Sequence, residues 1–530
     1  MLWRAGRCCY CKTRKRQGVT TRHEKFLVLK NAASNLIRGG ASAAVALLLP
    51  PFLTRSMSPE AFGAWSLVLQ LSAYVSYLDF GIQTAIARFV AHCTERRDAE
   101  HRDRIVSTAL AGLTGSGCIA FSGLFLLAFF LPRIFHHLQS SMVFDVRVAL
   151  LLVGGSLSIG LPASVFTGIF VGLQRNELPA AVIGGSRLVS AVLLVLVVRN
   201  GGGIAIMAVV LSLANLSSYA IQYLIYRRVI ASLVPTMHIS IRYVSMRSAR
   251  ELFDYCLSLT IWGFGLLLVT GLDLTLVGIY RFSQVAYYAV AATAVTFLAG
   301  LFGAIFGAMG STAAVVHARG DRAELGRLVV VTTRIGMILL LGTGLPLILF
   351  AHWVLRLWVG SEYATHASLL LQVLVAANVI RICVTPYVLA MIGSGEQRRV
   401  ILIPLLEGVT NLVCSVILGY YLGAIGIALG TLIGAIVSLA GNLFYNMPRT
   451  GEIQFSVGEY VKDSLLRPML CFIPFALSVS LWGSFSSTPL RSACAAVTCI
   501  VSVVLFWQIA LMPEERKRIS ALARARLAGL

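Results

Sequence analysis

Long apolar segments dominate this chain, and they constrain its fold more than any other feature. A helix that crosses the hydrocarbon core of a bilayer needs roughly 20 mostly apolar residues. The sequence contains fourteen such segments, at 33–53, 62–84, 105–131, 147–172, 178–198, 203–226, 254–280, 284–312, 328–350, 366–392, 400–420, 424–445, 465–484 and 492–512. The pattern predicts an all-α integral membrane protein with about fourteen transmembrane helices.

The composition excludes several other classes of protein. Only 12% of the residues are charged and 58% are hydrophobic, whereas soluble domains are about 25% charged. A water-soluble enzyme would lack surface polarity, and a disordered chain would carry too much apolar surface. The long runs lack the alternation of a β-barrel. A nucleic-acid-binding protein would cluster its arginines rather than spread them between apolar runs, so we expect no nucleic-acid partner.

Basic residues predict the orientation of the helices. If the N-terminus is cytoplasmic, 36 of the 44 Lys and Arg residues fall in cytoplasmic segments and 7 in outer segments. Arg381 lies within a span. An excess of this size that alternates loop by loop is the positive-inside signal of a multi-pass membrane protein. We therefore expect an even number of spans with both termini in the cytoplasm.

The chain also contains an internal repeat. A shift of 223 residues pairs Gly172 with Gly395, after the fourth and tenth spans. A shift of 225 residues pairs His92 with His317, Arg97 with Arg322 and Arg102 with Arg327. Six spans separate equivalent points, so the two halves have the same orientation, an arrangement known in transporters. We expect two parallel six-helix lobes around a central cavity, followed by two further helices.

The repeat divides the chain into domains. We expect a basic N-terminal arm, an N-lobe, a basic linker, a C-lobe, a final helix pair and a basic tail. Their expected bounds are 1–32, 33–230, 231–250, 251–446, 447–512 and 513–530.

Several motifs then resemble a known family. They include NLIRGG at 35–40, LPPFLTRSMSPEAFGAWS at 49–66, YLDFG at 77–81, LWVGSEY at 357–363 and YLGAIGIALG at 421–430. In order and spacing they resemble the polysaccharide-transport branch of the multidrug/oligosaccharidyl-lipid/polysaccharide exporter superfamily. The resemblance covers roughly 30–450, and individual motifs are of low specificity.

The resemblance implies a function that composition and periodicity do not. The implied protein is a flippase of the cell inner membrane that moves undecaprenyl-diphosphate-linked oligosaccharide repeat units by alternating access. Implied partners are that polyprenyl-diphosphate-linked oligosaccharide, the lipid bilayer, and a polysaccharide polymerase with its chain-length regulator. A lipid II flippase and a multidrug or metabolite antiporter of the same superfamily remain alternatives.

Ionisable residues inside the spans are the candidates for function, because charge at membrane depth is costly and usually functional. A diphosphate needs partners to cross an apolar layer, and the planar fork of arginine binds phosphate with two donors. Arg38 in the first span is the leading candidate, with snorkelling at the interface as the alternative. Arg334 is a weaker candidate of the same kind.

The other candidates have different expected roles. Asp273 could bind a coupling proton or cation, because burial disfavours the charged form of a carboxyl group, or it could make a structural hydrogen bond. Arg381 and Glu407 could line the cavity or pair with each other. Asp79 and Arg88 are structural or gating candidates at the cytoplasmic end of the second span.

The sequence contains no signature of an enzyme. It has no P-loop, no HExxH motif and no paired CxxC motifs, so ATP hydrolysis and a metal site are not expected. We expect no cofactor. A membrane glycosyltransferase or polysaccharide polymerase is disfavoured, because the longest expected outer loop, 132–146, is short.

Overall fold

The computed structural model describes residues 39–40, 42–230, 237–451, 453–480, 497–498, 500–510, 516 and 520. Within these residues the regular elements are helices, and eleven of them are long and apolar enough to cross a membrane. They correspond to the second to twelfth predicted spans. The other three predicted spans, at 33–53, 465–484 and 492–512, lie partly outside the described residues. The all-α membrane fold is confirmed, whereas a count of fourteen helices stays a prediction.

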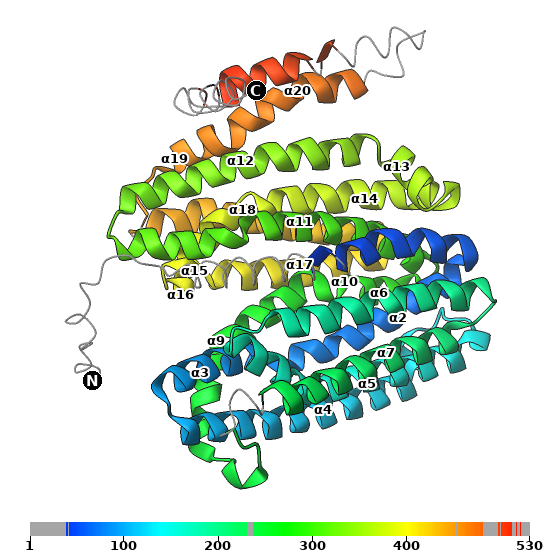
Figure 1. The fold of residues 1–530 in the computed structure, drawn as a ribbon. Coiled ribbons are helices and arrows are strands. Elements are labelled where there is room, and N and C mark those ends of the chain that lie inside the picture. The colour runs from blue at the N-terminus through cyan, green and yellow to red at the C-terminus, as the bar shows by residue number, and fades with distance from the viewer. Residues whose placement is uncertain are drawn as a thin grey trace, which may run out of the picture.

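The first lobe begins with a helix over 42–56. It continues with α2 (Pro59–Ala73), α3 (Ile82–Arg96), α4 (Ala99–Ile134), α5 (Ser140–Gly172), α6 (Glu177–Arg199) and α7 (Ile204–Ile225). Helix α5 packs against α2, α3, α4 and α7, so it forms the centre of this N-lobe. The lobe forms the lower half of Figure 1.

Apart from α9, which lies beside α3 in the lower half, the second lobe forms the upper half of the same view (Figure 1). It consists of α9 (Met246–Leu266), α10 (Asp273–Tyr280), α11 (Val285–Ala318), α12 (Arg322–Leu349), α13 (Ala351–Trp358), α14 (Ser361–Ile382), α15 (Thr385–Gly393), α17 (Leu402–Leu422) and α18 (Ala424–Gly441). The later helix α20 (Arg467–Ser480) packs against α12 on the outside of this C-lobe. Two six-helix lobes with an appended helix agree with the predicted architecture.

The helix N-caps show how the two lobes correspond. Helix α4 begins after Asp98 and α12 begins after Asp321, and each carboxylate accepts a hydrogen bond from the backbone amide three residues later, at 3.1 and 2.9 Å. The residue before each cap has a positive φ, 59° at Arg97 and 76° at Gly320. The caps therefore correspond at a shift of 223 residues. The shift of 225 inferred for this loop is two residues too large, because it matched side-chain identities rather than the backbone turn.

The first helix of the C-lobe is interrupted, whereas the sequence predicted one continuous span over 254–280. Helix α9 ends at Leu266, the π-helical turn η4 covers Leu267–Gly271, and α10 starts at Asp273. A π turn leaves some carbonyl groups without their usual helical donors. Two of them are satisfied from α17, where Asn411 Nδ2 donates to Leu268 O at 3.2 Å and to Val269 O at 2.7 Å.

Helix α9 begins at Met246, so the last five residues of the expected linker at 231–250 are helical. Residues 237–245 lie against α4, and their backbone amides donate to α4 side chains. The bonds run from His238, Ser240 and Ser245 to Asp103, Ser107 and Thr108, at 2.9, 3.2 and 3.1 Å respectively. This segment is therefore held against the N-lobe, and α9 follows it directly in the chain.

The lobes contact each other at both ends of the bundle. We call the end that carries the loops after α3, α5, α11 and α15 the basic end. At the opposite end, Trp358 Nε1 donates to Leu47 O at 2.7 Å. At the basic end, the guanidinium of Arg88 on α3 lies 4.7 Å from the ring centroid of Tyr255 on α9. His101 Nε2 on α4 lies 3.5 Å from Glu251 Oε2 on α9.

Candidate functional site

A cavity of about 510 Å³ lies between the two lobes. Its walls come from the helix over 42–56, α2, α10, α11, α14 and α18. Its polar lining includes Gln70, Asp273, Tyr288, Arg381 and Thr431. We call it the interlobe cavity. Two of the residues predicted from the sequence, Asp273 and Arg381, therefore face one shared space.

Asp273 is buried, with 6% of its surface exposed, at the first position of α10. Its Oδ2 accepts hydrogen bonds from Tyr288 Oη and Thr431 Oγ1, both at 3.0 Å. Asn411 Nδ2 approaches Oδ1 at 3.4 Å. These donors and the positive end of the α10 dipole favour a negative charge at a depth where burial opposes it. The arrangement suits a carboxylate whose charge can change.

The interruption of α9 also connects Asp273 to the N-lobe. The carbonyl oxygen of Gly271 accepts hydrogen bonds from Gln70 Nε2 and Tyr74 Oη of the N-lobe, both at 2.7 Å. Tyr74 Oη also lies 2.5 Å from Thr275 Oγ1. Because Gly271 is two residues before Asp273, this carboxylate lies next to a contact between the lobes.

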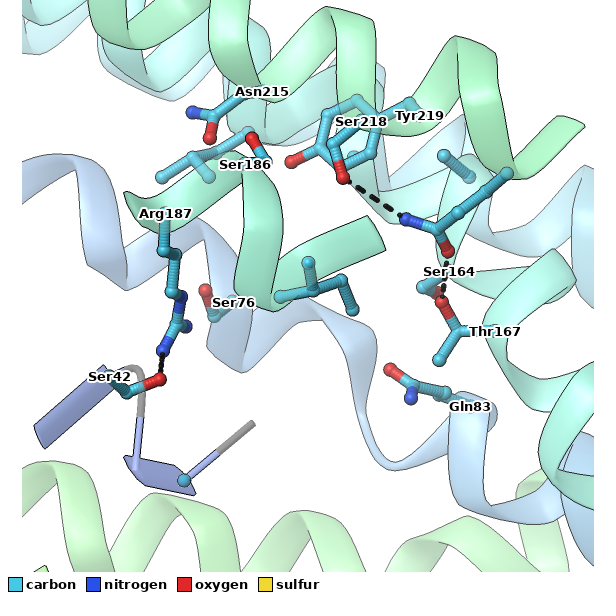
Figure 2. Close-up of a pocket in the computed structure, with 16 residues that line it drawn as sticks. Ser42, Ser76, Gln83, Ser164, Thr167, Ser186, Arg187, Asn215, Ser218 and Tyr219 are labelled. Carbon is cyan, nitrogen blue, oxygen red and sulfur yellow. Dashed lines mark hydrogen bonds between the residues drawn. The ribbon is translucent and has the colours of Figure 1, made fainter. Parts of the chain in front are cut away.

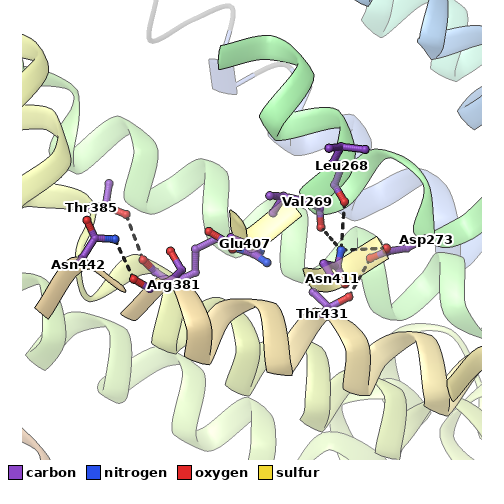
Figure 3. Close-up of polar contacts among 10 residues, drawn as sticks. Leu268, Val269, Asp273, Arg381, Thr385, Glu407, Asn411, Thr431 and Asn442 are labelled. Carbon is purple, nitrogen blue, oxygen red and sulfur yellow. Dashed lines mark hydrogen bonds and ion pairs between the residues drawn. The ribbon is translucent and has the colours of Figure 1, made fainter. Parts of the chain in front are cut away.

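Arg381 and Glu407 form an ion pair, with 2.5 Å between Arg381 Nε and Glu407 Oε1 (Figure 3). The side chain of Glu407 is 6% exposed and that of Arg381 is 21% exposed. Arg381 Nη2 is buried and has no hydrogen-bond partner among the described residues. The pair therefore neutralises Glu407, while part of the guanidinium fork of Arg381 is not engaged by a hydrogen bond.

One face of α17 carries both the partner of Arg381 and the side chain that binds the turn before Asp273. Glu407 and Asn411 lie four residues apart, so they project from the same side of the helix. Figure 3 shows Glu407 directed at Arg381 and Asn411 directed at the turn before Asp273. Helix α17 therefore contacts both Arg381 and the turn before Asp273.

The other predicted residues lie elsewhere. Arg334 is 1% exposed on α12 and does not line the interlobe cavity. Asp79 ends the 3-10 helix η1 (Tyr74–Asp79), accepts a hydrogen bond from Ser164 Oγ at 3.4 Å and lies at the turn into α3. Arg88 contacts Tyr255, as described above. Arg38, the leading candidate, lies outside the described residues.

A second cavity, of about 520 Å³, lies inside the N-lobe and was not predicted. We call it the N-lobe cavity. Its lining includes Arg187, which is one of the 36 basic residues that the orientation count placed in cytoplasmic segments. Helix α6 begins at Glu177, so Arg187 lies ten residues into it, about 15 Å from its start. The position of Arg187 in the middle of the predicted span at 178–198 was the sequence signal that could have identified it as a cavity residue.

Comparisons with known proteins agree with this architecture. Residues 28–309 match the family described as polysaccharide biosynthesis protein. The chain is 26% identical over 215 residues to a putative O-antigen transporter of Shigella flexneri, which covers 40% of this chain and 47%, about half, of that protein. It is 23% identical over 501 residues to the uncharacterized membrane protein EpsK of Bacillus subtilis, covering 90% of this chain and 95% of that protein.

The fold is also similar to a solved structure. The lipid II flippase MurJ, in an inward closed conformation, superposes with a TM-score of 0.68 over 91% of this chain and 99% of that one. The identity is 13%, so this likeness concerns the fold alone. Together with the sequence matches, it confirms the resemblance inferred from the motifs.

Proposed function

Because the chain belongs to the polysaccharide biosynthesis protein family, we propose that it is a flippase for undecaprenyl-diphosphate-linked oligosaccharide repeat units. The observation that carries the proposal is the interlobe cavity, which combines polar lining with an arginine, Arg381, whose Nη2 has no partner among the described residues. The polar side chains of such a cavity offer hydrogen bonds in place of the water that a diphosphate and its sugars would lose in the hydrocarbon layer. The polyprenyl tail stays in the bilayer.

The mechanism we propose is alternating access. The described lobes contact each other at both ends, through Trp358 and Leu47 at one end and through α3, α4 and α9 at the other. Opening one set of contacts while the other holds would expose the cavity to one side of the membrane at a time. The basic end faces the cytoplasm in this proposal, and the membrane is the inner membrane of the cell. A polymerase and a chain-length regulator would use the product.

Asp273 is the proposed coupling residue. Oxygen atoms of Asp273, Tyr288 and Thr431 lie close together, and oxygen donors suit a proton or a hard cation. Neutralising the carboxylate would weaken its attraction to the hydroxyl donors and release the turn at Gly271. That turn holds Gln70 and Tyr74, so the lobes would respond to the ion.

The two related functions are less well supported, one by the interlobe cavity and the other by the sequence comparisons. A pump for cationic drugs needs net negative charge, whereas the charges lining this cavity are one aspartate and one arginine. A lipid II flippase shares the fold, and its substrate has the same diphosphate. The sequence relatives favour surface polysaccharide over lipid II, because the matched family is one of polysaccharide biosynthesis.

Deletion of the gene tests the proposed function. We expect the lipid-linked repeat unit to accumulate on the cytoplasmic face of the inner membrane, because the diphosphate headgroup does not cross the apolar layer unaided. The measurement is the accessibility of the labelled saccharide in sealed inside-out and right-side-out vesicles. Normal surface polysaccharide in a strain without a redundant gene would contradict the proposal.

The substitution Arg38→Ala should abolish complementation of that deletion while leaving expression unchanged. The reason is the proposed contact of Arg38 with the diphosphate, which an alanine cannot replace. Surface polysaccharide and the amount of protein in the membrane are both measured. The matched control is Arg22→Ala, in the N-terminal arm, which should retain activity. Full complementation by Arg38→Ala would assign Arg38 to the membrane interface as a snorkelling residue.

A further inference from the structure

The N-lobe cavity differs chemically from the interlobe cavity. Its lining consists largely of hydroxyl and amide side chains on α3, α5, α6 and α7 and contains one charged residue, Arg187. No carboxylate is among its lining residues. Hydroxyl and amide groups both donate and accept hydrogen bonds, as sugar hydroxyls do. At about 520 Å³ the cavity has the size of a typical small-molecule site.

The local packing holds these polar groups in place. Thr167 Oγ1 donates to Gln222 Oε1 at 2.7 Å, which fixes the orientation of that amide. Gly160 on α5 leaves room for Tyr219, because a Cβ at this position would clash with the Tyr219 hydroxyl group. Figure 2 shows Tyr219, Ser218, Gln83 and Arg187 arranged around the same space. The cavity therefore presents donors and acceptors whose positions are fixed before a ligand arrives.

The two cavities are neighbours. The helix over 42–56 contributes Ser42 to the N-lobe cavity and Ala46, one turn later, to the interlobe cavity. The 3-10 helix η1 contributes Ser76 to the first and Tyr77 to the second. Arg187 Nη1 on α6 donates a hydrogen bond to Ser42 Oγ on the first helix (Figure 2). One elongated substrate could therefore occupy both cavities.

We propose that the N-lobe cavity is the saccharide-recognition site, in which neutral side chains bind sugar hydroxyls and Arg187 binds an acidic substituent of the sugar. This inference rests on the proposed function and assigns the two parts of the substrate to different cavities. The diphosphate stays in the interlobe cavity beside Arg381, and the oligosaccharide enters the N-lobe. Sugar selectivity then depends on α3, α5, α6 and α7, not on the C-lobe network.

The test uses the full-length protein in nanodiscs and three defined probes. They are undecaprenyl diphosphate, the same lipid carrying a neutral disaccharide, and the same lipid whose terminal sugar is a uronic acid. We expect affinity to increase in that order. The substitution Arg187→Gln should remove only the advantage of the acidic sugar, about tenfold, which corresponds to about 1.4 kcal/mol. The control Arg199→Gln, at the end of the same helix and outside the cavity lining, should change nothing.

A second variant tests the neutral part of the site. Gln83→Leu removes a side chain that lines the cavity, and it should reduce the affinity of both sugar-bearing probes three- to tenfold while leaving the sugar-free lipid unaffected. The control is Thr84→Val, at the exposed neighbouring position outside the cavity lining. Thermal unfolding of each variant reports whether the fold is retained.

The possible outcomes separate the two proposals. If no probe binds to the native protein, the proposed function fails and this inference fails with it. If the glycolipids bind but Arg187→Gln and Gln83→Leu keep full sugar selectivity, only this inference is overturned. If Arg187→Gln weakens all three probes equally, Arg187 binds the diphosphate, and the assignment to an acidic sugar is wrong.

Discussion

Replacing Arg381 with methionine should lower the free energy of unfolding by about 3–5 kcal/mol, the typical cost of leaving one member of a buried ion pair without its partner. Glu407 is 6% exposed, and Arg381 Nε is its partner at 2.5 Å. Without Arg381, the carboxyl group must either remain charged without a partner or take up a proton. The measurement is equilibrium unfolding of the purified protein in bicelles.

The double variant Arg381→Met with Glu407→Leu should recover most of that loss, because it removes both charges and fills the space of the ion pair with apolar side chains. Glu407→Leu alone should cost less than Arg381→Met alone, since Arg381 is 21% exposed and still faces the cavity that contains Asp273. If both single variants are as stable as the native protein, the pair has no structural role.

A surface pair in the same lobe provides a matched control. Arg399 Nε lies 2.8 Å from Glu396 Oε2, and the two side chains are 48% and 32% exposed. Exposed pairs contribute about 0–1 kcal/mol, so Arg399→Met should have little effect on unfolding. Equal losses at Arg399 and Arg381 would show that burial does not determine the effect.

The substitution Asp273→Asn should reduce transport at least about tenfold, which corresponds to about 1.4 kcal/mol or more of lost interaction, while the protein still folds. Asparagine preserves the volume but cannot hold the negative charge to which the hydroxyls of Tyr288 and Thr431 donate. The measurement is flux of a labelled lipid-linked saccharide in vesicles, with and without an imposed proton or sodium gradient. The gradient response should disappear together with the flux.

Asp254→Asn is the control for charge alone, since Asp254 is exposed on α9. It should leave both the flux and the gradient response intact. Thr431→Val removes one hydroxyl donor to Asp273, and it should shift the ion concentration at half-maximal flux rather than abolish flux. If Asp273→Asn retains the gradient response of the native protein, Asp273 is a structural hydrogen-bond acceptor and not a coupling residue.

The overall architecture was predictable because membrane insertion imposes strong patterns on sequence. Spans must be long and apolar, and basic residues mark one side. The lobes could be inferred because both halves repeat the same loops. The register of one loop was wrong by two residues, because Arg97 was paired by identity with Arg322. The structure instead pairs the backbone turns at Arg97 and Gly320.

The candidate site was predictable only in part. Charge at membrane depth singled out Asp273, Arg381 and Glu407, and depth alone is enough to find such residues. Arg187 was missed although it lies in the middle of the predicted span at 178–198, because the orientation count records the number of basic residues on each side and not their depth. The hydroxyl and amide side chains of the N-lobe cavity gave no signal, since serine and threonine are common in membrane helices.

By itself, the sequence determined that this protein is a bundle of membrane helices in two related halves, because hydrophobicity and charge act on each segment separately. Only the tertiary structure decided which polar groups meet. Asp273 lies more than a hundred residues from Asn411 and Thr431 along the chain, yet the side chains of both donate hydrogen bonds to its carboxylate. Their meeting depends on the π turn before α10 and on the packing of α17 and α18. Those are properties of three-dimensional packing, which no single segment encodes.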